Sequence, residues 1–223
     1  INERQRGQIT EAATTFARAG NYRNAGTIEF ILDREGRFYF LEMNTRLQVE
    51  HPVTEMRVGM DIVREQIFIA EGRRLRVTQE EISFSGHAVE CRIYAEDPYN
   101  SFFPSIGTIA FLRSPSGFGI REEIGVEATS AITPYYDPLI SKLITWGKTR
   151  TEALDRMDSA LRSYEIFGVR NNLPLCTWVI GHPMFREGRF NTHFLQNQFT
   201  PDHLERPSDL LETVGIVAAA LCG

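Results

Sequence analysis

Features that mark several classes of protein are missing from this sequence. Its 223 residues include only three cysteines, Cys91, Cys176 and Cys222, which lie far apart and form no CxxC pair, so neither a disulfide framework nor a zinc site is expected. No apolar run approaches the roughly 18 residues that a membrane span needs. There is no block of Lys and Arg and the formal net charge is −5, which argues against a nucleic-acid or acidic-membrane surface. Separate free thiols indicate a reducing compartment, so we expect a cytoplasmic protein, or one of the mitochondrial matrix if the source is eukaryotic.

The first residues include neither an initiator Met nor a charged-then-apolar signal segment. We therefore expect the chain to be a piece of something longer. The composition itself is that of an ordinary globular protein, with 42% hydrophobic and 24% charged residues, which excludes a disordered tail or a collagen-like chain. The length predicts one large domain or two modest ones.

In the first part of the chain, apolar residues at helical spacing predict a helix over residues 8–19. Two β-rich runs, 27–32 and 38–43, stand on either side of a Gly-containing turn and predict a hairpin. A second helix is expected over 61–71. The charged residues 73–82 then suggest a seam between two domains.

The second part predicts a strand over 86–96, ended by Asp97-Pro98, and another over 140–146. Thr149 and Glu152 have the spacing of a capping box, and the helix that follows carries an apolar stripe. Other expected features are a short helix capped by Asn171 or Asn172 and a last helix over 210–221 that begins near Pro207 and packs against something outside this chain.

Two carboxylates in the hairpin are the first candidates for a functional site. If a two-residue loop at Glu35-Gly36 closes the hairpin, Arg34 pairs with Arg37 and Glu29 pairs with Glu42. Like charges directly opposed across a ladder are destabilising, so a cation between them is expected. Carboxylate oxygens suit Mg²⁺ or Mn²⁺. The alternative is a salt-bridged surface hairpin that uses one of the arginines.

Polar residues crowd together directly after this hairpin, between Asn44 and His51. Asn44 shares the strand parity of Glu42 and can add an amide oxygen. Arg46 offers a planar fork that matches a carboxylate or carbonate, and Glu50 can take a proton from a bound oxyacid. This pattern is typical of an active-site loop at the end of a sheet, but a solvated loop has the same composition. Farther along, Arg92 and Glu90 alternate onto one strand face, which by itself indicates an ordinary cross-strand ion pair.

Four segments together resemble the biotin carboxylase family of ATP-grasp enzymes, over about residues 8–199. They are Glu29 with EMNTRLQVEHPVTE at 42–55, GHAVECRIYAEDP at 86–98, TPYYDPLISKL at 133–143 and NTHFL at 191–195. The resemblance implies an α+β chain in which the C-terminal part of an ATP-grasp domain (1–82) precedes the biotin carboxylase C-terminal α/β domain (83–199). Residues 200–223 would be a linker or helix toward a following region.

The resemblance also implies ATP-dependent carboxylation of biotin by bicarbonate. In this family the carboxylates that match Glu29 and Glu42 hold divalent ions, Mg²⁺ or Mn²⁺, that bridge the phosphates of ATP, with Asn44 beside them. Ile31 matches a residue that lines the adenine pocket.

The bicarbonate pocket of the family matches Arg46, Gln48 and the backbone of Val49. Glu50 matches the base that deprotonates bicarbonate for attack on the γ-phosphate, which gives carboxyphosphate. That intermediate breaks down to CO₂ and phosphate, and the phosphate deprotonates the ureido nitrogen of biotin. Arg92 matches the residue that stabilises the resulting biotin enolate. Glu50, Arg46 and Arg92 are therefore the expected catalytic residues.

The resemblance implies partners as well: a biotin carboxyl carrier protein or domain, a carboxyltransferase subunit and a second copy in a homodimer. Because the family's glycine-rich phosphate loop would lie upstream of Ile1, this chain alone is expected to be inactive. The sequence around Leu47 and over 52–56 is more similar to that of acyl-CoA carboxylases, such as acetyl- or propionyl-CoA carboxylase, than to that of pyruvate carboxylase. Three alternatives are pyruvate carboxylase, another ATP-grasp ligase such as a carbamoyl-phosphate or purine-pathway enzyme, and a non-catalytic copy kept as an interaction module.

Overall fold

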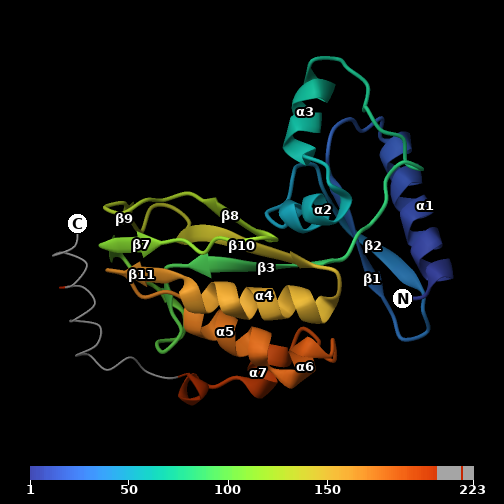
Figure 1. The fold of residues 1–223 in the computed structure, drawn as a ribbon. Coiled ribbons are helices and arrows are strands. Elements are labelled where there is room, and N and C mark those ends of the chain that lie inside the picture. The colour runs from blue at the N-terminus through green and yellow to red at the C-terminus, as the bar shows by residue number, and fades with distance from the viewer. Residues whose placement is uncertain (205–216, 218–223) are drawn as a thin grey trace. The chain divides into compact units, whose positions relative to one another are not determined.

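The chain forms two compact units, Ile1–Phe84 and Ser85–Gly223, in a computed structural model that describes residues 1–204 and 217 (Figure 1). Of the last helix expected from the sequence, over 210–221, only Val217 is described, and Cys222 lies outside the described residues. Among the described residues, no helix combines the length and apolar character that crossing a membrane requires.

The first unit contains three helices and one hairpin. These are α1 (Glu3–Ala19), β1 (Thr27–Leu32), β2 (Phe38–Asn44), α2 (His51–Val58) and α3 (Ile62–Ala70). Helix α1 begins five residues earlier than predicted because Asn2 and Gln5 form a capping box: the Asn2 side chain accepts from the Gln5 N–H at 2.9 Å and the Gln5 side chain accepts from the Asn2 N–H at 3.0 Å. Helix α2 has no counterpart among the elements predicted from the sequence.

The hairpin differs from the prediction at its turn. The Asp33 N–H donates to the carbonyl oxygen of Arg37 at 2.9 Å and the Gly36 N–H donates to that of Asp33 at 3.1 Å, so three residues, 34–36, form the loop. Gly36 has a φ of 83°, the left-handed conformation that such loops require. The predicted two-residue loop with Arg34 opposite Arg37 is therefore wrong. The Arg37 guanidinium instead pairs with the Asp33 carboxylate at 2.7 Å.

A three-stranded antiparallel sheet in the order β3-β10-β8 forms the centre of the second unit. Its strands are β3 (His87–Tyr94), β10 (Leu139–Gly147) and β8 (Ile120–Ile124). Helix α4 (Arg150–Ser163) packs against β3 and β10, and α5 (Leu173–Gly181) packs against α4 (Figure 1). The short elements are α6 (Pro183–Arg186), α7 (Phe194–Gln198), a 3₁₀ turn at Pro201–His203, and the pairs β4 (Glu96–Asp97) with β5 (Phe103–Pro104), β6 (Gly107–Thr108) with β9 (Ala131–Ile132), and β7 (Phe111–Arg113) with β11 (Glu165–Phe167).

The core of the second unit lies between this sheet and α4. Ile93 of β3 and Leu143 of β10 are fully buried, and so are Leu154 and Met157 of the predicted apolar stripe on α4. Fully burying one such side chain contributes about 1.5–3 kcal/mol relative to leaving it exposed. Burial alternates along β3 from Val89 to Tyr94 and so fixes which face of this strand points away from the core, whereas β10, the central strand, is buried at most of its positions.

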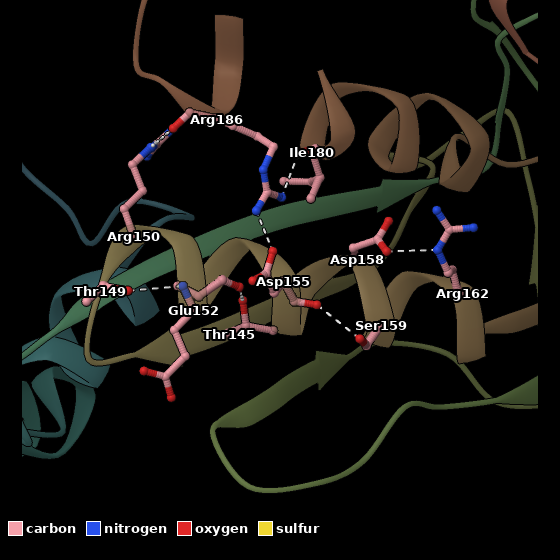
Figure 2. A network of polar contacts seen from close by, with 11 residues as sticks. Thr145, Thr149, Arg150, Glu152, Asp155, Asp158, Ser159, Arg162, Ile180 and Arg186 are labelled. Atoms are coloured by element: carbon pink, nitrogen blue, oxygen red, sulfur yellow. Dashed lines mark hydrogen bonds and ion pairs between the residues drawn. The ribbon is translucent and has the colours of Figure 1, made fainter. Parts of the chain in front are cut away.

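Polar contacts fix the N-terminal half of α4 (Figure 2). The Glu152 N–H donates to Oγ1 of Thr149 at 3.2 Å, as a capping box predicts, but the Glu152 carboxylate accepts from the N–H of Lys148 rather than from that of Thr149. Arg150 donates to the Phe185 carbonyl oxygen at 2.6 Å, and Arg186 pairs with the carboxylate of Asp155. These contacts attach α6 to α4.

Candidate functional site

A β-bulge decides which side chains of the hairpin share a face. Glu29 pairs with Glu42, as predicted, whereas its neighbour Phe30 pairs with Phe40, so Leu41 is an extra residue in β2. Adjacent residues of β1 point to opposite faces, and the bulge lets their partners on β2 do the same. Phe40 therefore lies on the face covered by α1, where its ring stacks on Phe16 at 4.9 Å between centroids. Glu29 and Glu42 lie together on the other face.

Amide side chains connect the two carboxylates on this polar face. Nδ2 of Asn44 donates to Oε1 of Glu29 and to Oε1 of Glu42, each at 3.1 Å. Nε2 of Gln48 donates to the same oxygen of Glu29 at 3.0 Å. The structure thus brings four of the predicted site residues into one hydrogen-bonded cluster.

The loop after β2 adds the charged groups. Arg46 donates to the Leu47 carbonyl oxygen at 3.1 Å and approaches Oδ1 of Asn44 at 3.4 Å. Val49 is half-buried next to it, and Glu50 is exposed at the start of α2. Both ring and main chain of His51 contact the Gln48 carbonyl oxygen, which turns the chain into that helix. An exposed carboxylate such as that of Glu50 can exchange a proton with a bound oxyacid.

Ile31 completes this face of the hairpin. It is two residues beyond Glu29 on β1, so strand alternation places both side chains on the same side. Its side chain is 55% exposed, which leaves an apolar surface beside the carboxylates. The arrangement combines an apolar patch with a polar cluster, as in sites that hold a flat ring next to charged groups.

The donor set fits a hard divalent cation. Two carboxylates and one amide converge, and Mg²⁺ is usually bound through one or two carboxylates and substrate phosphates. Because the oxygen and nitrogen of an amide exchange places by a flip, Asn44 can present Oδ1 to a cation as readily as it donates Nδ2 to the carboxylates. The residues that would hold Mg²⁺ are therefore Glu29, Glu42 and Asn44.

Arg92 belongs to the second unit, on β3. Its Nε lies 3.6 Å from Oε1 of Glu90, an ion pair along the strand rather than the cross-strand pair that the alternation indicated. Its cross-strand neighbour is Lys142, another cation, which pairs with Glu123 of β8. Each of the two opposed cations thus has a carboxylate, which offsets their repulsion.

Sequence reasoning missed one residue next to Arg92. Asn172 is the first residue before α5, yet its side chain makes no cap hydrogen bond. Its Nδ2 donates instead to the carbonyl oxygen of Arg92 at 3.0 Å, and its Oδ1 accepts from the Tyr94 N–H at 2.9 Å. The Leu173 N–H donates to Oδ1 of Asn171 at 3.1 Å, so Asn171 takes the local capping role. The sequence pattern could indicate a capping asparagine at this position, but it could not indicate that the side chain bonds to Arg92, 80 residues earlier.

Two family models match the chain. Residues 1–78 match the model described as Carbamoyl-phosphate synthase L chain, ATP binding domain. Residues 90–197 match the Biotin carboxylase C-terminal domain. Between them they cover both units.

Known proteins similar to this chain are biotin carboxylase subunits. Biotin carboxylase 2 of Bacillus subtilis is 49% identical over 88% of this chain and 44% of its own length, and the mouse mitochondrial propionyl-CoA carboxylase alpha chain is 50% identical over 91% and 28%. Other relatives of similar identity are named as subunits of 2-oxoglutarate and pyruvate carboxylases. The chain spans less than half the length of these relatives.

The folds agree as well. The biotin carboxylase domain dimer of Hydrogenobacter thermophilus 2-oxoglutarate carboxylase, solved with MgADP, ADP and bicarbonate, is 48% identical and superposes with a TM-score of 0.88. The match covers 93% of this chain and 46% of that one.

Proposed function

We propose that this chain, which belongs to the biotin carboxylase family, is the C-terminal half of an enzyme that carboxylates biotin with bicarbonate at the expense of ATP. The observation that carries the proposal is the polar face of the hairpin, where Glu29, Glu42, Asn44 and Gln48 form one cluster beside Arg46. The fit of this donor set to Mg²⁺ agrees with the MgADP and bicarbonate in the similar solved structure.

In the proposed site, Glu29, Glu42 and Asn44 hold Mg²⁺, or Mn²⁺ in its place, against the phosphates of ATP, and Ile31 packs against the adenine. The bound cation supplies positive charge that neutralises the phosphoryl group during transfer. The amide of Gln48 already donates to Glu29, so it links the metal ligands to the bicarbonate pocket.

Arg46, Gln48 and the backbone of Val49 bind bicarbonate in this scheme. Glu50 takes the bicarbonate proton, and the oxyanion attacks the γ-phosphate, which releases ADP and forms carboxyphosphate. Carboxyphosphate then breaks down to CO₂ and phosphate, the phosphate takes the proton of the ureido nitrogen of biotin, and this nitrogen attacks CO₂. The guanidinium of Arg92 stabilises the negative charge that develops on the ureido oxygen, as a preorganised cation does in electrostatic catalysis.

The wider assignments are part of the same proposal. Residues 1–82 are the end of the ATP-grasp domain, 83–199 the C-terminal domain and 200–223 a connection to a following region. The partners are a biotinylated carrier protein or domain, a carboxyltransferase and a second copy of the subunit, and the location is the cytoplasm or the mitochondrial matrix. Since relatives are named for propionyl-CoA, pyruvate and 2-oxoglutarate, the proposal concerns the shared biotin carboxylation step, with an acyl-CoA or a keto acid as the final acceptor.

The packing of the first unit supports the proposal that more chain belongs to it. Of its 84 residues only Pro52, Glu55 and Glu65 are buried, and α1 buries none. A shallow apolar groove runs between α1 and β2, lined partly by Phe16 and Phe38. A unit of this size usually requires a larger buried core, and the N-terminal half of an ATP-grasp domain would supply it. This chain alone should therefore not turn over ATP.

Two observations bear on the other candidates. A different ATP-grasp ligase would share the metal carboxylates, but it would have no use for Arg92 or for the match of residues 90–197. A non-catalytic copy is disfavoured because the acidic, amide and arginine side chains of the cluster are all present and in contact.

The test is an ATP cleavage assay on a full-length subunit that carries this sequence. ATP, Mg²⁺, bicarbonate and free biotin are supplied together, and bicarbonate and biotin are then omitted in turn. Biotin carboxylase activity requires cleavage to depend on bicarbonate and to rise with biotin. Cleavage that ignores both, or that requires another acceptor such as ammonia, would refute the proposal.

A further inference from the structure

Arg92 lies on an edge strand. In the sheet order β3-β10-β8, one edge of β3 pairs with β10, and no strand among the described residues pairs with the other edge. The carbonyl of Arg92 and both main-chain polar groups of Tyr94 point to that open edge, because residues two apart in a strand face the same edge. Such groups need partners if they are to stay fixed.

Asn172 supplies all three partners. Its Nδ2 donates to the Arg92 carbonyl oxygen at 3.0 Å, its Oδ1 accepts from the Tyr94 N–H at 2.9 Å, and its own N–H donates to the Tyr94 carbonyl oxygen at 3.1 Å. The residue is only 7% exposed, so water does not replace these bonds easily. Asn172 therefore makes the hydrogen bonds with β3 that a neighbouring strand would otherwise make.

The opposite edge of β3 is irregular at the same place. Tyr94 pairs with Leu139 and Ile93 pairs with Ser141, so Ile140 is an extra residue in β10. A bulge disrupts the ladder locally and bends the strand. The main chain just after Arg92 consequently depends more on Asn172 than a regular strand would.

The loop that carries Asn172 is itself held in place. Gly168 has a φ of 101°, and a Cβ there would lie 2.2 Å from the carbonyl oxygen of Thr108, so only glycine fits. The Arg170 N–H donates to Oγ of Ser105 at 2.9 Å. The loop that carries Asn172 is thus anchored by contacts other than those of Asn172 itself.

We propose that Asn172 is a positioning residue that fixes the main chain of Arg92 and thereby the guanidinium that acts on biotin. The inference rests on the proposed role of Arg92. Displacement of a catalytic group by about 1 Å can cost on the order of 100-fold in rate, so loss of these bonds should lower biotin carboxylation about tenfold to 100-fold. Bicarbonate-dependent ATP cleavage, which uses residues of the first unit, should change little.

The experiment uses the full-length subunit and two assays on every variant: bicarbonate-dependent ATP cleavage without biotin, and carboxylation of free biotin. Asn172→Ala removes both side-chain bonds. Asn172→Asp has nearly the same shape and keeps the acceptor for the Tyr94 N–H, but it replaces the donor to the Arg92 carbonyl with an oxygen. Asn171→Ala is the matched control, because its side chain bonds only to Leu173 and Ile166.

Positioning predicts that both Asn172 variants lower the ratio of biotin carboxylation to ATP cleavage, while Asn171→Ala keeps it. It also predicts that Asn172→Asp has no further effect on this ratio when Arg92→Ala is already present. Equal losses in the two assays, or an unchanged ratio in the well-folded Asn172→Asp variant, would overturn the inference. If Arg92→Ala itself leaves the ratio unchanged, the proposed role of Arg92 fails first, so the two failures are distinguishable.

Discussion

The two units of the chain hold their side chains in different ways. In the second unit the described residues bury 22 hydrophobic side chains, and Ile93, Leu143 and Leu154 among them have no exposed surface. By the same count, which leaves out proline, the first unit buries no hydrophobic side chain, and Phe40 and Leu41 of the hairpin remain half exposed. The candidate site of the first unit is therefore held by hydrogen bonds between polar side chains, whereas Arg92 is held by its main chain on a packed sheet.

This difference implies that stability and catalysis respond to different parts of the molecule. Substitutions in the polar cluster should change chemistry with little effect on folding. Substitutions beneath β3 and β10 should change folding, and they should reach the chemistry only through the position of Arg92.

The largest effect is expected for Glu50→Gln in the full-length subunit. Without a base for bicarbonate, the rate of bicarbonate-dependent ATP cleavage should fall about 10²- to 10⁴-fold. The free energy of unfolding should change by no more than about 0.5 kcal/mol, because Glu50 is exposed. Glu11→Gln, an exposed position on α1, is the control for the loss of one charge. Normal turnover by the Glu50→Gln variant would show that Glu50 is not the base that deprotonates bicarbonate.

The next largest effect is a difference between the two units in how much a core substitution lowers stability. Leu154→Ala empties a fully buried position and should lower the free energy of unfolding of the second unit by about 2–5 kcal/mol. Phe40→Ala in the first unit should cost less, about 1 kcal/mol, because half of its surface is already exposed. Denaturant unfolding of both variants checks this difference. Equal losses in the free energy of unfolding would contradict the contrast in packing between the two units.

Removal of one metal ligand should act on the dependence on Mg²⁺. Glu29→Gln or Glu42→Gln should raise the Mg²⁺ concentration needed for half-maximal ATP cleavage by at least about tenfold, a loss of the size reported when groups around metal sites are removed. Glu35→Gln, in the exposed turn of the same hairpin, is the control. If all three variants behave alike, the carboxylates do not hold the ion.

The smallest effect concerns pH. Burial acts to raise the pKa of the Glu123 carboxyl, but hydrogen bonds from Lys142 and Arg121 outweigh it, so the pKa is lowered from its usual value. A lowered folded-state pKa gives stability that is present above the ordinary pKa and lost as the pH falls through the lowered one. For this partly exposed pair the contribution is about 0.2–1 kcal/mol. Glu123→Gln should therefore destabilise the protein at pH 7 but make little difference near pH 3, measured by denaturant unfolding; the opposite pH dependence would contradict the pairing.

Much of the hairpin and of the α4 region could be predicted from the sequence because local patterns determine them. The pairing of Glu29 with Glu42 is confirmed, although the predicted loop was too short by one residue. The longer loop shifts the pairing of β1 with β2 by one residue relative to the prediction, and the extra residue Leu41 shifts it back before Glu29 and Glu42 are reached. No local sequence pattern predicts this bulge, because the contacts that favour it are tertiary. The bulge lets Phe40 contact α1 while Glu42 stays beside Glu29.

The contacts around Arg92 could not be predicted for a similar reason. The sequence predicts that Asn171 or Asn172 caps a helix, which is what asparagine does locally, and Asn171 takes that role. Its actual partners are main-chain groups of β3, 78 and 80 residues earlier in the chain. Only the folded sheet shows that no strand within residues 1–204 pairs with this edge, so the proposed role of Asn172 depends on the sheet topology rather than on a local sequence pattern.

The central claim is that this chain helps to move the carboxyl group of bicarbonate to biotin. The most direct test incubates the full-length subunit with ATP, Mg²⁺, free biotin and isotope-labelled bicarbonate, and measures the label that enters biotin. We expect labelled carboxybiotin in proportion to the ATP consumed, with the label abolished by Glu50→Gln and strongly reduced by Arg92→Ala. ATP consumption without label in biotin would contradict it.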